Sequence, residues 1–154
     1  LAFSAGRYLD TAKKAAGFIM DNGFDTEGNL KRIADKYSDL SGTLEDYAYF
    51  IHGLIALSYV TKDALLLAKA ELLMEQAHKR FFDTKSGGYF YATRTERLPF
   101  QIKSGDDSTL PNANAIMLQN ITQLFSMTGK DIYKSQAQAL CDFFLRGNDR
   151  NMLE

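Results

Sequence analysis

The chain has 154 residues, 45% hydrophobic and 24% charged, which is the balance of one ordinary globular domain and excludes a disordered chain. Its net charge of -1 supplies no basic surface for nucleic acid or for an anionic membrane. The single cysteine, Cys141, excludes an internal disulfide and suits a cytoplasmic protein.

The spacing of apolar residues predicts five helices, over residues 3–21, 43–59, 64–81, 111–127 and 131–145. Between the first two helices, Gly23, Gly28 and Gly42 break the pattern. A long loop over residues 82–110 contains Gly87-Gly88 and a short β-like run over 89–91. We therefore predict an all-α protein with one short β-hairpin in its longest loop.

The predicted helices are of two kinds. Residues 47–61 and 108–129 contain no Asp, Glu, Lys or Arg, and a helix that is apolar around most of its circumference is buried. A membrane span needs about 20 mainly apolar residues. The helix over 43–59 is too short for one, and the helix over 111–127 carries Asn112, Asn114, Gln119, Asn120 and Gln123. This excludes membrane spans.

The other three helices are amphipathic and are expected to lie outside the two uncharged ones. In the helix over 64–81, Glu75 and Lys79 form a favourable i,i+4 pair on the water-facing side. The side predicted to face inward carries Leu65, Ala68, Leu72 and Leu73.

An internal repeat underlies this alternation. A shift of 67 residues superposes Leu54, Leu57 and Thr61 on Ile121, Leu124 and Thr128, and Tyr47-Ala48 on Asn114-Ala115. A shift of 58 superposes Phe24-Asp25-Thr26 on Phe82-Asp83-Thr84. Each unit is an inner helix, a short turn, an outer helix and a long loop, and such units must stack on neighbours to bury both faces. The repeat predicts a toroid of alternating inner and outer helices with long loops on one rim.

An ordered set of motifs carries a resemblance to a known family: residues 44–48, 81–90, Lys103, Asp106-Asp107 and 111–115. It resembles the helical region of the spermatogenesis-associated protein 20 family. The resemblance implies part of an (α/α)6 barrel, similar to N-acylglucosamine 2-epimerases and six-hairpin glycosidases, in a larger protein with a thioredoxin-like domain. Where that family has Pro-Ser-Gly-Asn-Ser, only Pro111 and Asn114 match here.

The ends of the chain suggest a piece of such a protein. Leu1 lies within a helical pattern, and Leu153-Glu154 resembles the residues that an expression vector leaves before a His tag. We therefore expect residues 1–152 to be a fragment of an α/α barrel domain, with 153–154 as a vector-derived tail.

Four carboxylates are the candidate catalytic groups, because they precede or open the two uncharged helices: Glu45, Asp46, Asp106 and Asp107. Glycoside hydrolysis needs two carboxylates, about 5–5.5 Å apart for retention or about 6.5–9.5 Å for inversion. The alternative is structural. Thr43 and Asp46 have the spacing of a capping box, and Asp106-Asp107 beside Gly105 fits a solvated turn. Whether the protein is an enzyme stays open.

The candidate sugar-binding residues are Tyr47, Lys103, Asn112 and Asn114. Tyr47 either stacks on a sugar ring or packs in the core, one of the two asparagines is expected to cap a helix, and Lys103 either meets an anionic group or is solvated. Epimerases of the related fold use a pair of histidines, but His78 lies on an outer helix, so His52 is predicted to be a hydrogen-bonded core residue. The absence of a Cys/His cluster or a phosphate loop predicts neither metal nor cofactor.

Two hypotheses of function follow. The first is a fragment of a carbohydrate-binding or carbohydrate-processing barrel, inactive alone, with a sugar ligand and with the rest of the barrel and a thioredoxin-like domain as partners. Its exposed seam predicts a homodimer. The second is a non-catalytic helical scaffold that binds a protein partner. Convergence of the polar rim residues into one pocket would favour the first, and their dispersal beside an apolar groove the second.

Overall fold

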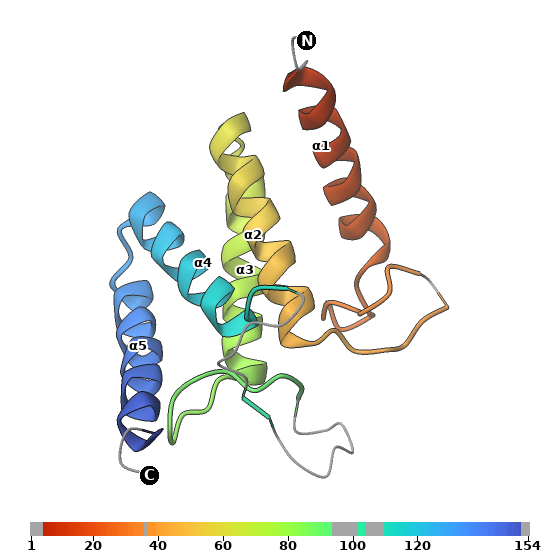
Figure 1. Ribbon diagram of the computed structural model, residues 1–154. Helices are drawn as coiled ribbons and strands as arrows, with labels where there is room; N and C mark the ends of the chain where they lie inside the picture. The colour runs from red at the N-terminus through yellow and green to blue at the C-terminus, as the bar shows by residue number, and fades with distance from the viewer. Residues whose placement is uncertain (1–4, 36, 94–101, 104–109, 152–154) are drawn as a thin grey trace.

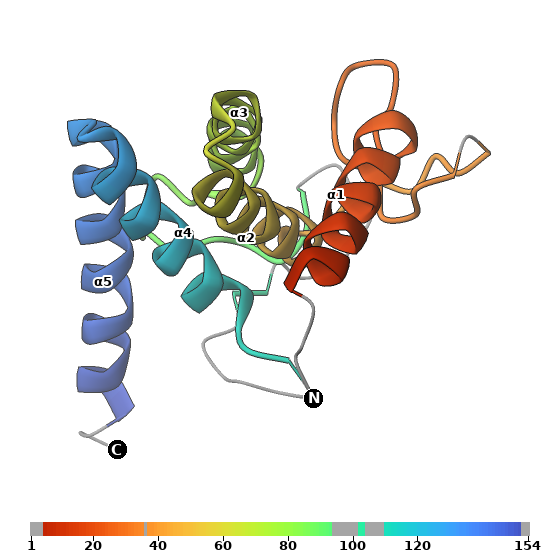
Figure 2. The same cartoon turned by 90° about the horizontal axis from the view of Figure 1, so that it is seen from above.

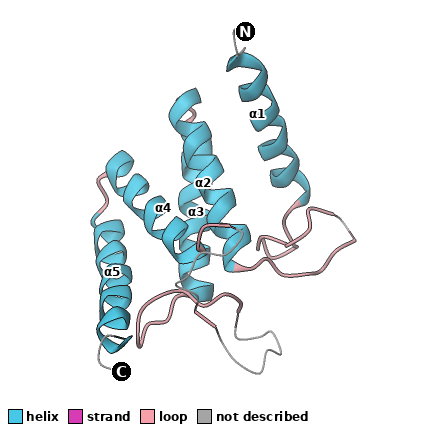
Figure 3. Cartoon of the chain, viewed as in Figure 1, coloured by secondary structure: helices cyan, strands magenta, loops and turns pink. Residues whose placement is uncertain are grey.

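The computed structural model describes residues 5–35, 37–93, 102–103 and 110–151. That part of the chain forms five helices: α1 (Ala5–Asn22), α2 (Leu44–Thr61), α3 (Ala64–Phe81), α4 (Ala113–Thr128) and α5 (Asp131–Asn151). Figure 3 shows that helices and loops make up all of the described chain. Asp106, Asp107 and the tail over 153–154 lie outside the described residues.

The helix ends follow local chemistry. Asp63 caps α3, where its carboxylate accepts the Leu65 N–H at 2.8 Å. The short turns after α2 and α4 place Lys62 and Gly129 in the left-handed region, with φ of 58° and 69°. The predicted bounds of α3 are confirmed, whereas α5 continues six residues beyond the predicted end at 145.

The helices form two layers, as predicted. Inner helices α2 and α4 pack against each other, α3 packs on α2, and α5 packs on α4 (Figures 1 and 2). Inner helices run in one direction and outer helices in the other, so both long loops lie at one end and both short turns at the opposite end (Figure 1). α1 runs parallel to the outer helices and touches α2 only sparsely.

The core lies between the layers. Its largest fully buried aliphatic side chains include Ile51 and Leu54 of α2 and Met117 and Ile121 of α4. The predicted inward face of α3 was wrong in part: Leu73 is buried, but Leu65 is 80% exposed, Leu72 47%, and Ala68 is exposed as well. The buried face of α3 consists of Ala70, Leu73, Met74, Ala77 and Phe81. The face is set by contact with α2, which the sequence of α3 alone does not specify.

The two long loops begin with similar turns, as the repeat predicts, and the second turn is one residue longer than the first. Asp25 accepts the Glu27 N–H on its side chain and the Gly28 N–H on its carbonyl, at 2.9 and 3.1 Å. Asp83 accepts the Lys85 and Gly87 N–H groups in the same way, at 2.9 and 2.8 Å. Gly28 and Gly87 both have φ near 80°, which a side chain would strain. An isolated antiparallel bridge closes each turn. The predicted β-hairpin is represented, among the described residues, by the second of these bridges, between Phe82 and Tyr89.

Each inner helix keeps one face open. On α2 this face carries Glu45, Tyr49, His52, Ala56 and Tyr59, and on α4 it carries Ala115, Gln119, Thr122, Gln123 and Ser126. These positions recur every three or four residues and so share one side of each helix. No helix in the described ranges combines the length and the hydropathy needed to cross a membrane.

Candidate functional site

The two carboxylates at the start of α2, Glu45 and Asp46, have different roles. Asp46 accepts the Thr43 N–H at 2.7 Å and the Thr43 hydroxyl at 2.9 Å, which closes the first turn of the helix. Glu45 makes no hydrogen bond or ion pair within the described part of the chain. Of the two, Glu45 is the carboxylate free to meet a ligand.

Glu45 lines a rim pocket of about 440 Å³ between the first long loop and α2. Arg32 of the first long loop lines the same pocket. Tyr49, also in the lining, donates its hydroxyl proton to the Pro111 carbonyl at 2.9 Å, which ties α2 to the chain before α4. The Tyr91 hydroxyl beside Arg32, and then the charges of Asp46 and Glu45, raise the pKa of the guanidinium. The pocket therefore presents a carboxylate and a permanent cation together.

Tyr47 and Asn114, which the repeat superposes, perform the same structural task. Tyr47 is fully buried, and its hydroxyl accepts the Leu30 N–H at 2.9 Å. Asn114 is 2% exposed; its amide accepts the Tyr89 N–H at 2.8 Å and donates to the Tyr89 carbonyl at 3.1 Å. Each residue thus holds the preceding loop against an inner helix. Neither offers an exposed face to a sugar ring.

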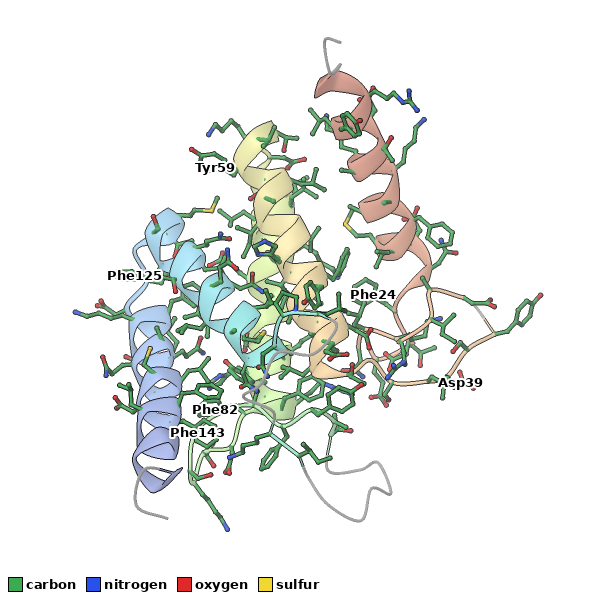
Figure 4. The ribbon with its side chains drawn as sticks, in the orientation of Figure 1. Phe24, Asp39, Tyr59, Phe82, Phe125 and Phe143 are labelled. Atoms are coloured by element: carbon green, nitrogen blue, oxygen red, sulfur yellow. The ribbon has the colours of Figure 1, made fainter. Side chains whose placement is uncertain are left out.

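Asn112 and Lys103 also bond within the protein. Asn112 caps α4 by accepting the Asn114 N–H at 2.8 Å, as one of the two asparagines was predicted to do. The Lys103 ammonium donates to the Asp83 carboxylate at 2.7 Å, to the Ser86 hydroxyl at 2.7 Å and to the Gly87 carbonyl at 2.6 Å. It also lies within 5 Å of the Phe90 and Phe143 ring centres. Figure 4 shows Phe82 and Phe143 at this long-loop end of α3 and α5.

The Lys103 contact makes a testable contribution to acid stability. The Lys103 hydrogen bond, and then that of Ser86, hold the pKa of Asp83 well below its usual range. The carboxyl of an unfolded Asp has a pKa of about 3.9. The contribution of this contact to folding stability is therefore complete at higher pH and is lost as the pH falls from about 5 toward 2. We expect Lys103→Met to flatten the fall in melting temperature over that interval. Lys79→Met, which removes the exposed pair with Glu75, is the control. An unchanged slope in Lys103→Met would contradict the assignment.

A second pocket, of about 430 Å³, lies between the open faces of α2 and α4. The described residues around it include no charged group and combine hydrogen-bonding with apolar side chains: His52, Ile55, Ala56, Tyr59, Val60, Gln119, Gln123, Ser126 and Met127. Tyr59 is 64% exposed and lies near the short-turn end of α2 (Figure 4). We refer to this site as the inner-face pocket.

The glutamines of this pocket are not among the sugar-binding residues predicted from the sequence. Gln119 and Gln123 are one turn apart in a helix without charged residues, and that spacing is the signal that could have identified them. His52 was predicted to be hydrogen-bonded, and its Nδ1 lies 3.0 Å from the Asn120 side-chain oxygen. His78 lies on the outer helix, where its Nδ1 is 3.1 Å from the Tyr89 hydroxyl and burial lowers its pKa.

A third hollow is an apolar groove of about 540 Å³ between α1 and α2. Its α1 side includes Leu9, Ala12 and Ile19, and its α2 side includes Leu57 and Val60. Among the described residues, no three His, Cys, Asp or Glu side chains gather as metal ligands would.

The architecture defines the class. Inner helices all run one way, outer helices all run the other way, and loops gather on one rim, which is the arrangement of an α/α toroid. A cellobiose 2-epimerase from Spirochaeta thermophila DSM 6192 has this fold, with a TM-score of 0.71 and 23% identity over 94% of this chain and 38% of its own. A family 76 glycoside hydrolase (mannosidase) from Bacteroides thetaiotaomicron VPI-5482 also matches, with a TM-score of 0.64 and 17% identity over 91% of this chain and 38% of its own.

Sequence similarity gives the family. Spermatogenesis-associated protein 20 of Mus musculus is 31% identical over 157 residues, which cover 93% of this chain. The chain is homologous to spermatogenesis-associated protein 20 over about nine-tenths of its own length, as its motifs predicted. It spans about a fifth of the length of that relative. No model of a protein family matches it.

Proposed function

We propose that the chain forms part of the wall of a carbohydrate-processing α/α barrel, and that the inner-face pocket together with the rim around Glu45 meets the sugar. The observation that carries the proposal is the uncharged polar lining of the pocket between two inner helices. The solved proteins of the same fold that are named for a reaction on cellobiose or as a mannosidase support it.

The chemistry of the lining suits a neutral polyhydroxyl ligand. The amides of Gln119 and Gln123 each offer both donors and an acceptor, which matches hydroxyl groups that also do both. The exposed ring of Tyr59 carries the Lys62 ammonium over one face, 4.3 Å from the ring centre, and its other face is proposed to meet the C–H side of a sugar. Glu45 lies on the same face of α2 as His52 and Tyr59 and is the candidate acid or base at the rim.

Catalysis would need more of the protein than this chain. Glycoside hydrolysis uses two carboxylates, and Asp106 and Asp107, the candidate partners of Glu45, lie outside the described residues. The chain also spans about a fifth of its relative's length. We therefore expect this chain to bind sugars weakly and to turn none over, and the remaining hairpins and a thioredoxin-like domain are proposed as its partners in the parent protein.

A sugar-binding experiment tests the proposal. We expect cellobiose or mannose to raise the melting temperature of this chain and of the full-length parent, because a ligand that binds the folded state stabilises it. Gln119→Ala/Gln123→Ala should weaken the binding at least about tenfold, the loss of one or two good hydrogen bonds. Gln138→Ala, on the exposed side of α5, is the matched control. No stabilisation by any mono- or disaccharide would contradict the proposal.

The second candidate function is a protein-binding scaffold. The apolar groove between α1 and α2 favours it, because exposed apolar surface of this kind marks interaction sites. The structural use of Tyr47, Asn112, Asn114 and Lys103 agrees with it as well. The homodimer predicted from the exposed seam of a barrel fragment stays a prediction. The sugar experiment separates the two functions, since a scaffold predicts no stabilisation by sugars.

A further inference from the structure

One buried side chain connects the two inner helices at the middle of the wall. Asn120 of α4 is fully buried, and its amide nitrogen donates to the Ala48 carbonyl of α2 at 2.8 Å. Its amide oxygen lies 3.0 Å from Nδ1 of His52, one turn further along α2. Asn120 therefore makes two contacts with α2 from a single position.

These two contacts determine which nitrogen of His52 carries the proton. A backbone carbonyl only accepts, so the amide NH₂ must face Ala48 and the amide oxygen must face His52. An amide oxygen also only accepts, so Nδ1 of His52 must be the donor. In the neutral imidazole the proton is then on Nδ1, and Nε2 carries the lone pair.

The lone pair at Nε2 is available to a ligand. His52 is half-buried and lines the inner-face pocket, while Nδ1 is directed to the buried amide. Nε2 lies on the other side of the ring, makes no hydrogen bond within the described residues, and is not among their buried unpartnered atoms. An acceptor held in one orientation at the wall of a pocket is suited to receive an O–H group.

We propose that Nε2 of His52 accepts a hydrogen bond from a hydroxyl of a neutral carbohydrate in the inner-face pocket, with Asn120 as the positioning residue that fixes the tautomer. The proposal rests on the proposed function and specifies its ligand. None of the described lining residues is Lys or Arg, although the Lys62 ammonium lies 4.3 Å from the centre of the Tyr59 ring. The lone pair at Nε2 of His52 repels an anionic group placed against it. Neutral sugars are therefore the substrate class, in preference to sugar phosphates or sugar acids.

Nitrogen NMR of the chain tests the tautomer directly. The chain has two histidines, so His78→Gln leaves only the His52 signals. We expect a protonated Nδ1 and an unprotonated Nε2 in the wild type, and a mixture of tautomers in Asn120→Leu. Should Asn120→Leu fail to fold, the wild-type spectrum still decides. A protonated Nε2 in neutral wild-type His52 would overturn this proposal and leave the sugar function standing.

Titration with cellobiose, mannose and glucose 6-phosphate tests the ligand. We expect a neutral sugar to shift the Nε2 resonance, His52→Leu to weaken its binding at least tenfold, and His78→Gln to leave it unchanged. Glucose 6-phosphate should bind at least tenfold more weakly than the neutral sugar. Binding of a neutral sugar with no change at Nε2 would overturn the role of His52 alone. Absence of binding by any sugar would overturn this role and the proposed function together.

Discussion

Asn114→Ala is expected to lower the free energy of unfolding by roughly 2–6 kcal/mol, because two buried backbone groups lose their partners at about 1–3 kcal/mol each. Both groups belong to Tyr89, which is itself fully buried, so water cannot replace the amide without opening the loop. Urea unfolding followed by circular dichroism measures the change through the transition midpoint.

Two neighbouring variants give this result its meaning. Asn112→Ala removes the helix cap and should cost about 1 kcal/mol. Asn114→Asp keeps an acceptor for the Tyr89 N–H but places a carboxylate oxygen against the Tyr89 carbonyl, so it should not restore stability. A loss of less than about 0.5 kcal/mol in Asn114→Ala, the range of a neutral surface change, would show that the amide does not hold the loop.

Tyr47→Phe is expected to cost about 1–3 kcal/mol, since the Leu30 N–H loses its acceptor in a buried place. Tyr47→Ala should cost about 3–5 kcal/mol, because it also removes an aromatic ring that packs edge-on against Phe81 at 5.4 Å. The same urea measurement applies to both variants. Tyr59→Phe, at an exposed ring of the same helix, should stay within about 0.5 kcal/mol of the wild type. Equal behaviour of Tyr47→Phe and Tyr59→Phe would contradict the assignment.

The layout of the fold was largely predictable from sequence. Charge-free segments at a repeat of 67 residues indicated the inner helices, and the structure places them there. The wrong face predicted for α3 has a physical cause. Leu65 and Leu72 were predicted to face inward because they are hydrophobic, but the buried face includes the small residues Ala70 and Ala77, which let α3 pack closely on α2. α5 also continues beyond its predicted end through Gly147, a residue that is unfavourable within helices.

The candidate site was less predictable. The repeat correctly predicted that Tyr47 and Asn114 occupy equivalent positions. It did not predict their role, since both side chains bond the preceding loop and do not lie on the open face. Their partners Leu30 and Tyr89 are 17 and 25 residues away. The His52–Asn120 contact spans 68 residues and depends on how two helices are rotated. Periodicity along one helix does not contain that information.

The attachment of each long loop to the inner helix that follows it has a consequence for engineering. Leu30 is held by Tyr47 and Tyr89 by Asn114, so a cut within either long loop would separate hydrogen-bonded partners. The natural cassette for transplantation or shuffling is therefore an outer helix, its loop and the next inner helix, such as residues 63–128, with both joints at the short turns. An exchange that moves an inner helix, its short turn and the following outer helix together would separate each long loop from the inner helix to which it is hydrogen-bonded.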